Sequence, residues 1–206
     1  MRMHNSIKKH SMKSLDQIIH IHIPRTAGTS IKSGLFMESQ PHFFARKYIQ
    51  MRPDWSNCFK FSFVRNPWDR AVSLFSHQNG EGDSQDFKNW LLDMVEKNGH
   101  PNDRTIEWKV TDQLDGTGGI PFPWKSQTDW LIDYSGNICM DFIGRFENLN
   151  QDIYILEKLI GHTILLPHLR KTKHGSYQDY YLDQESIDLV ADWGRKDIEN
   201  FGYSFE

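Results

Sequence analysis

The stretch Gln17-Ile-Ile-His-Ile-His-Ile-Pro-Arg-Thr-Ala-Gly-Thr-Ser30 decides the fold of this chain. Its first part is rich in β-branched isoleucine, which alternates with His20 and His22. Such alternation of β-branched residues predicts a β-strand, here near the centre of a sheet. Pro24 ends the strand, and residues 31–37 suit a helix. The predicted order is therefore strand, short loop, helix.

The same order recurs at Phe59-Lys-Phe-Ser-Phe-Val-Arg65, which reads as a second strand. Asn66 follows it as a good N-cap, and Pro67 takes the first helical position, where proline is favoured. Asp69 then falls in the first turn, where the helix dipole favours an acidic side chain. We therefore expect a helix to begin directly after this strand.

The rest of the chain continues the alternation of helices and strands. The pattern predicts a helix over Asp86–Lys97, a long loop over 98–125, a short helix over Gln127–Tyr134 and a strand over Met140–Arg145. Asn148 and Gln151 resemble a capping box for a further helix, and Asp183 is expected to cap one last helix that reaches Ile198. This alternation predicts an α/β fold with a parallel sheet.

Composition restricts the class of protein. The 206 residues suit one domain, expected over 15–206, after a flexible basic tail over 1–14. The net charge of −3 argues against a nucleic-acid binder held by general positive charge, so any anion site must be local. No apolar run is long enough for a membrane span, and residues 1–14 lack the apolar run of a signal peptide.

These features favour a cytoplasmic protein over a lumenal enzyme that has been trimmed of its anchor. The two cysteines, Cys58 and Cys139, allow one disulfide, but a reducing compartment is the simpler interpretation. His20 and His22 share a strand face and could suggest a metal, but no third ligand is evident in the sequence. We therefore expect no metal.

The loop 24–30 is the first candidate for chemistry. A glycine-containing loop between a strand and a helix turns backbone N–H groups toward one point and can bind phosphate, although an ordinary turn has the same pattern. Thr29 and Ser30 add hydroxyl donors, and Arg25 adds a full charge. The loop is not a Walker A motif because no Lys follows Gly28, which argues against a P-loop-type small-molecule kinase without excluding it.

Arg65 and Ser73 form the second candidate. Arg65 ends its strand and therefore points into the crevice beyond the carboxyl ends of the sheet, where open α/β sheets bind their ligands. Ser73 follows within the next helix, so a guanidinium and a hydroxyl could converge on one phosphate. The alternative is a salt bridge for Arg65 and an ordinary surface position for Ser73.

These segments resemble those of a known family. Ile-His-Ile-Pro-Arg-Thr-Ala-Gly-Thr-Ser resembles the 5′-phosphosulfate loop of sulfotransferases, and Phe-Val-Arg-Asn-Pro-Trp-Asp-Arg-Ala-Val-Ser resembles their 3′-phosphate motif. Asp141–Leu149 and Phe201–Phe205 are similar to segments of the carbohydrate sulfotransferase branch, which includes heparan sulfate 2-O-sulfotransferase. The resemblance runs from about Ile18 to Phe205, nearly the whole chain.

The resemblance implies a P-loop-kinase-like parallel sheet flanked by helices on both faces, and an enzyme that needs no metal. The donor would be 3′-phosphoadenosine 5′-phosphosulfate (PAPS), and the acceptor a hydroxyl, on a saccharide by analogy with the branch. Arg65 and Ser73 would hold the 3′-phosphate. The 5′-phosphosulfate would be held by Thr26, Ala27, Gly28, Thr29 and Ser30, together with Arg25.

Arg25 departs from the family pattern, because the usual residue at this place is Lys. Arginine keeps its charge and presents a planar fork of donors, so Arg25 can stabilise leaving charge but cannot readily give up its proton. We therefore expect it to act as an electrostatic catalyst. The same departure leaves open a nucleotide- or glycan-binding protein that has lost catalysis.

The acceptor hydroxyl needs a base, and histidine suits this role at neutral pH. His42 is the first choice, since its place resembles that of the catalytic histidine in the 2-O-sulfotransferase branch. His77 comes second because it lies one turn after Ser73, and His22, near the end of the first strand, comes third. The alternative for each histidine is a surface or core residue without a catalytic role.

Three later features complete the expectations. Arg170 and Lys173 belong to a basic cluster over 168–174, which could close over the nucleotide phosphates or be a solvated loop. Aromatic residues in the long loop could stack on a sugar ring or pack the loop onto the body; they are Trp108, Phe122 and Trp124. Glu147 is expected to pair with Arg145 or to orient a catalytic group.

Overall fold

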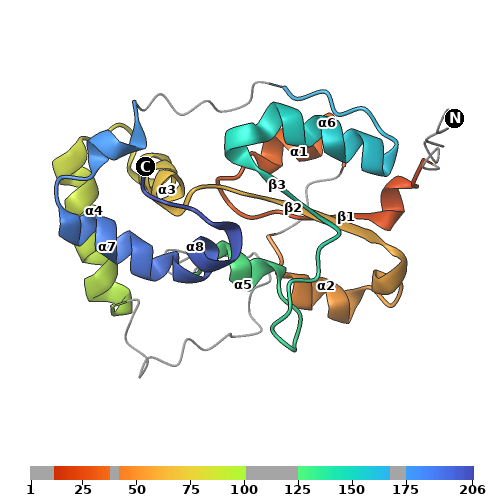
Figure 1. Ribbon diagram of the computed structural model, residues 1–206, viewed down its shortest axis with the longest axis horizontal. Helices are drawn as coiled ribbons and strands as arrows, with labels where there is room; N and C mark the ends of the chain where they lie inside the picture. The colour runs from red at the N-terminus through yellow and green to blue at the C-terminus, as the bar shows by residue number, and fades with distance from the viewer. Residues whose placement is uncertain (1–11, 38–41, 101–124, 168–174) are drawn as a thin grey trace, which may run out of the picture.

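The computed structural model describes residues 12–37, 42–100, 125–167 and 175–206 (Figure 1). Within these residues three strands form one sheet: β1 (Ile18–Ile21), β2 (Phe59–Val64) and β3 (Phe142–Arg145). Their order in the sheet is β1-β2-β3, and both pairs are parallel. β2 is therefore central, and the carboxyl ends of all three strands meet at one edge.

One face of the sheet is covered by α1 (Gly28–Gly34) and α6 (Leu149–Ile160), which lie together on the same side in Figure 1. Both helices join the strands in one hydrophobic cluster. Its buried members are Ile18, Ile31, Leu35, Phe61, Phe63, Ile153, Leu156, Ile160 and Ile164. Burial of such side chains is the main force that holds the two helices to the sheet.

A second and larger cluster contains Ile19 and Ile21 of β1 and Val64 of β2. It joins the remaining helices, which are α2 (Ala45–Met51), α3 (Pro67–Asn79), α4 (Ser84–Asn98), α5 (Gln127–Leu131), α7 (Gln184–Trp193) and α8 (Arg195–Phe201). The predicted α/β fold, a parallel sheet with helices on both faces, is therefore confirmed.

The alternation in β1 sends its side chains to both faces. Ile19 and Ile21 belong to the larger cluster, whereas the ring of His20 stacks on Phe61 on the opposite face, with centroids 4.6 Å apart. All four residues of β1 are buried. The strand is thus covered on both faces, but it lies at an edge of the sheet that the described residues form, so its predicted place near the centre was wrong.

The predicted start of α3 is confirmed. The side chain of Asn66 accepts hydrogen bonds from the backbone N–H groups of Trp68 and Asp69, at 3.0 and 3.4 Å. Pro67 occupies the first turn, and Gly194 packs against it so closely that an added Cβ would lie 2.7 Å from Cβ of Pro67. The junction of α7 and α8 therefore contacts the very start of α3.

Several boundaries differ from the predictions. The capping box at Asn148 was wrong: this residue ends a 3-10 turn at φ −111° and ψ 26°, and its side chain makes no capping bond. The last helix breaks at Gly194 into α7 and α8, although Asp183 does cap α7 as predicted. The pattern did not predict α2.

The described ranges also contain four short 3-10 turns, which are η1 (Leu15–Gln17), η2 (Trp55–Asn57), η3 (Phe146–Asn148) and η4 (Tyr177–Tyr180). None of the helices in these ranges has the length and apolar character needed to cross a membrane. Cys58 and Cys139 are both free thiols.

Candidate functional site at the carboxyl ends of β1 and β2

The candidate site begins with the loop Pro24–Ala27, which lies between β1 and α1 and is here called the donor loop because the resemblance assigns the sulfuryl donor to it. Two of its residues have left-handed backbone conformations, Arg25 at φ 71° and Ala27 at φ 66°. Neither is glycine, so each conformation costs about 1–2 kcal/mol and must be held by its surroundings. One internal contact is the hydroxyl of Thr26, which is fully buried and donates to the carbonyl of Ile23 at 2.9 Å.

The donor loop leads directly into α1, whose N-cap is Ala27 and therefore has no capping side chain. The backbone N–H groups in the first turn of a helix have no acceptor within the helix. Here Ala27 offers them no side-chain acceptor. Gly28 is also required for packing, since a Cβ there would lie 1.9 Å from Cδ2 of His22.

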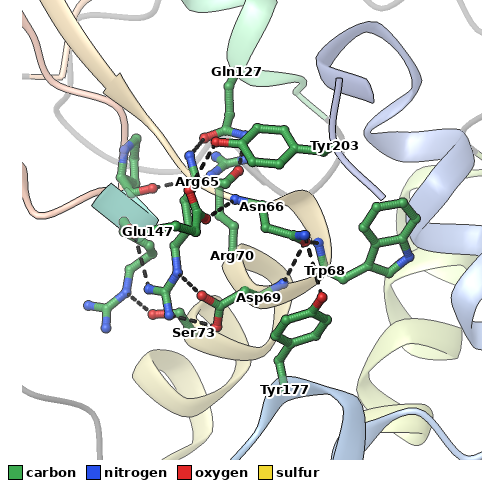
Figure 2. Close-up of polar contacts among 12 residues, drawn as sticks. Arg65, Asn66, Trp68, Asp69, Arg70, Ser73, Gln127, Glu147, Tyr177 and Tyr203 are labelled. Carbon is green, nitrogen blue, oxygen red and sulfur yellow. Dashed lines mark hydrogen bonds and ion pairs between the residues drawn. The ribbon is translucent and has the colours of Figure 1, made fainter. Parts of the chain in front are cut away.

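Arg65 lies at the end of β2 and is 5% exposed. Its guanidinium donates to the carboxylate of Asp69 in a bidentate manner, from Nε at 2.6 Å and from Nη2 at 2.7 Å (Figure 2). Its Nη1 donates to the carbonyl of Arg25 at 3.2 Å, and its Cζ lies 4.1 Å from the ring centroid of Phe146. A guanidinium carries five N–H donors, so two remain for a ligand.

The backbone of Arg65 is held by the side chain of Gln127 in α5. The amide nitrogen of Gln127 donates to the carbonyl of Arg65 at 2.6 Å, and its oxygen accepts the N–H of Arg65 at 2.8 Å. Figure 2 shows Gln127 reaching Arg65 from α5. The side-chain amide of Gln127 thus bonds to both backbone polar groups of Arg65, as a neighbouring strand would, and fixes the end of β2.

Gln127 is in turn held by Asp197 of α8, which is 1% exposed. The carboxylate of Asp197 accepts the backbone N–H groups of Gln127 and Thr128 at 2.8 and 2.7 Å, and the hydroxyl of Thr128 at 2.9 Å. Burial raises the pKa of Asp197, whereas these hydrogen bonds oppose the shift. A chain of contacts thus runs from α8 through α5 to Arg65.

Ser73 brings the two motifs together. It is fully buried in α3, and its hydroxyl accepts a hydrogen bond from Nε of Arg25 at 3.0 Å. Arg25, Arg65 and Ser73, predicted from separate segments, therefore lie in one site. Thr29 is exposed and Ser30 half-buried in the first turn of α1.

Arg70 also belongs to this site, although the sequence analysis did not single it out. Its guanidinium is buried and donates to the carbonyl of Pro24 in the donor loop at 3.2 Å. A signal in the sequence could have identified Arg70. It lies within the motif that runs from Arg65 to Ser73 and precedes Ser73 by three residues, so the two share one face of α3.

The histidines His22 and His42 form a second part of the site. His42 lies before α2, and its ring centroid is 4.2 Å from that of His22. Its Nδ1 is 2.9 Å from the carbonyl oxygen of His22. Because a carbonyl can only accept, Nδ1 carries the proton and donates it, and the neutral ring presents Nε2 as an acceptor.

The surroundings keep these rings neutral. Burial lowers the pKa of His42, its bond to the carbonyl of His22 raises it, and the charge of Lys32 lowers it further. Burial also lowers the pKa of His20 to about 3 and lowers that of His22 strongly. Lys32, 7% exposed in α1, acts on all three rings, and no feature of the sequence pointed to it.

Other predicted residues lie elsewhere or outside the described residues. His77 is exposed in the last turn of α3, whereas His22 is 8% exposed. Arg170, Lys173 and the aromatic residues Trp108, Phe122 and Trp124 fall in ranges that the structure does not describe.

The predicted pairing of Arg145 with Glu147 was wrong. Glu147 accepts the backbone N–H of Asn66 at 2.6 Å and the hydroxyl of Tyr203 at 3.2 Å (Figure 2). Arg145 instead donates to the carbonyl of Phe201, and its Cζ lies 4.9 Å from the ring centroid of Tyr203. Glu147 therefore supports the start of α3, next to Arg65.

Comparisons with known proteins address the family directly. Neither the curated proteins nor the solved structures contain a match to this chain. A family model described as "Sulfotransferase family" does match, over residues 10–204, and thus covers the donor loop, the α3 motif and both histidines. Since this match spans almost the entire sequence, the chain belongs to the sulfotransferase family.

Proposed function

We propose that the chain transfers the sulfuryl group of PAPS to a hydroxyl group on a saccharide. One observation carries the proposal: Arg25 contacts Ser73, and Arg65 contacts the carbonyl of Arg25. These contacts bring the guanidinium groups of Arg25 and Arg65 together beside Ser73 of α3, at the carboxyl ends of β1 and β2. PAPS carries phosphate groups on the 3′- and 5′-oxygens of one ribose, which matches two anion-binding motifs that converge at one place.

The residues divide the donor between them. The 3′-phosphate is assigned to Arg65, which has two N–H donors left, and to Ser73. The 5′-phosphosulfate is assigned to Thr26–Ser30 and to Arg25. Arg170 and Lys173 are proposed as further phosphate contacts, on the family position alone.

The proposed reaction moves one proton and one sulfuryl group. Nε2 of His42 accepts the proton of the acceptor hydroxyl, whose oxygen forms the new bond to sulfur. The bond between sulfur and the bridging oxygen breaks, and the electron pair stays on the departing 5′-phosphate. Arg25 stabilises that negative charge. His77, which lies in the exposed last turn of α3, is the second choice for the base.

A saccharide is proposed as the acceptor because Asp141–Leu149 and Phe201–Phe205 resemble the carbohydrate branch of the family. In the structure the two segments meet at the site, since Glu147 accepts from Asn66 and from Tyr203. They support the start of α3 and do not themselves select an acceptor. Transfer assays with saccharide, peptide and simple alcohol acceptors therefore test this part of the proposal.

The test is calorimetric titration with 3′-phosphoadenosine 5′-phosphate (PAP), the product that remains after transfer, with ATP as the control. We expect micromolar binding of PAP and little binding of ATP. A preference for ATP would overturn the donor in favour of a small-molecule kinase. Tight PAP binding without transfer from labelled PAPS to saccharide, peptide or simple alcohol acceptors would instead identify a binding protein that has lost catalysis.

A further inference from the structure

Arg70 is a buried arginine that the proposed reaction does not use. It is 2% exposed in α3, and its guanidinium contacts backbone, not a ligand site at the surface. Nε donates to the carbonyl of Pro24 at 3.2 Å and Nη1 to the carbonyl of Lys125 at 3.4 Å. Figure 2 shows Arg70 on α3 behind Arg65 and Asp69. One side chain therefore ties the donor loop to the segment that enters α5.

The contact with Pro24 has a specific consequence for the donor loop. The carbonyls of Pro24 and Arg25 belong to the two peptide planes on either side of the Cα of Arg25. Arg70 holds the first of them and Arg65 the second, at 3.2 Å each. Two fixed peptide planes fix both φ and ψ of the residue between them. Arg25 is the left-handed residue of the loop, at φ 71°, so these contacts hold the conformation that is strained.

The charge of Arg70 also favours the binding of an anion at the donor loop. Burial lowers the pKa of Arg70 to about 10, so the group remains charged at neutral pH. Asp197 is the acidic group that favours this charge, but its oxygens already accept hydrogen bonds from Gln127 and Thr128. Nη2 of Arg70 has no hydrogen-bond partner among the described residues. A buried and incompletely compensated cation beside the donor loop favours an anion bound there.

We propose that Arg70 is a positioning residue for the donor loop: it holds the peptide between Pro24 and Arg25 so that the loop binds the 5′-phosphate end of the nucleotide. The inference rests on the proposed function, since it assigns that end of the donor to this loop. It predicts that Arg70 contributes to binding chiefly through the 5′-phosphate, whereas a general structural role would affect all ligands equally.

The experiment compares two nucleotides by calorimetry. PAP carries both phosphates, and 3′-AMP carries only the 3′-phosphate, so the ratio of their affinities measures the contribution of the 5′-phosphate. Arg70→Met removes both carbonyl contacts and the charge. We expect it to weaken PAP binding at least about tenfold, because the peptide between Pro24 and Arg25 is no longer held and the loop loses a neighbouring charge, and to weaken 3′-AMP binding much less.

The matched control is Arg52→Met. Arg52 also donates to a backbone carbonyl, that of Asp16, at 2.7 Å, and it is paired with Asp54, but it does not contact the donor loop. Its ratio of affinities should equal that of the wild type. If Arg70→Met does not fold, Arg70→Gln decides by the same criterion, because it removes the charge and leaves a polar amide for the buried carbonyls that Arg70 contacts.

The outcomes separate the inference from the proposed function. If the wild type does not prefer PAP to 3′-AMP, the assignment of the donor loop fails and the inference fails with it. If the wild type shows the preference and the folded Arg70 variant keeps the same ratio, only the role of Arg70 is overturned. An equal loss of both nucleotides would also overturn it, because a purely structural role predicts that result.

Discussion

Nε of Arg25 donates a hydrogen bond to the hydroxyl of Ser73 at 3.0 Å, and this contact joins two segments that lie 48 residues apart in the chain. Arg25 belongs to the donor loop after β1, and Ser73 is fully buried in α3. Arg25, assigned to the 5′-phosphosulfate, thereby contacts a residue assigned to the 3′-phosphate. Arg25 takes the place at which the family usually has Lys, and its planar fork suits this contact.

Arg25→Ala should lower the rate of sulfuryl transfer by at least about 100-fold, because it removes the charge that stabilises the departing phosphate. Binding of PAP should remain measurable, since Arg65 and Ser73 are still present. Arg25→Lys keeps the charge and is expected to retain more activity than Arg25→Ala. Steady-state kinetics and calorimetry on both variants check this, and an unchanged transfer rate in Arg25→Ala would remove Arg25 from the reaction.

Arg65→Ala should weaken PAP binding by about 10- to 100-fold, the effect of losing charged hydrogen bonds to a phosphate. It also leaves the carboxylate of Asp69 unpaired and repulsive. Adenosine 5′-phosphosulfate lacks the 3′-phosphate, so its affinity should fall much less, only through the lost contact of Arg65 with the carbonyl of Arg25. Arg195→Ala, at an exposed position of α8, is the control. An equal loss for both nucleotides would show that Arg65 does not read the 3′-phosphate.

His42→Ala should abolish turnover and leave the affinity for PAP almost unchanged. A base is active only when unprotonated, so the rate of the wild type should fall as the pH falls through the pKa of His42. Burial lowers that pKa, and the acid limb of kcat should therefore lie below 6.5, the ordinary value. The pH profile of kcat tests this. Loss of activity in His77→Ala, with activity kept in His42→Ala, would transfer the role to His77.

Gly28→Ala should destabilise the protein by about 2 kcal/mol, because the new methyl group would overlap the ring of His22, with 1.9 Å between Cβ and Cδ2. His22→Ala removes that ring. Adding Gly28→Ala to His22→Ala should therefore cost much less than adding it to the wild type, a coupling that a double-mutant cycle by urea denaturation measures. If the changes in the free energy of unfolding were strictly additive, the predicted steric overlap between residue 28 and the ring of His22 would be contradicted.

Asp197→Asn should lower the free energy of unfolding by about 2 kcal/mol. Both carboxylate oxygens accept hydrogen bonds, so the NH₂ group of an asparagine would face donors of Gln127 or Thr128. Asp188→Asn, at an exposed position of α7, is the matched control and should change the stability little. Chemical denaturation of the two variants gives the comparison, and equal stabilities would contradict the role of Asp197 as an anchor of α5.

Local sequence signals predicted the elements that depend on neighbouring residues. The strands around Ile19 and Phe61, the cap at Asn66 and the cap at Asp183 were all predicted correctly. Prediction failed where distant contacts decide. Asn148 has a suitable cap sequence, but the preceding 3-10 turn gives it a backbone that does not let its side chain cap the helix. Likewise, Gly194 divides the last helix where the chain packs against Pro67.

The sequence by itself determined the α/β order and the two motifs, because strand alternation, helix caps and the residues of a loop are properties of short segments. Only the tertiary structure decided that Arg25 meets Ser73, that Arg70 holds the carbonyl of Pro24 and that Asp197 anchors Gln127. These contacts span 46 to 70 residues. The first two form because parallel pairing of β1 with β2 brings the carboxyl ends of both strands to one edge, and the third forms because α8 packs against α5. Which side chains meet at these places depends on packing between distant segments, which a local pattern does not encode.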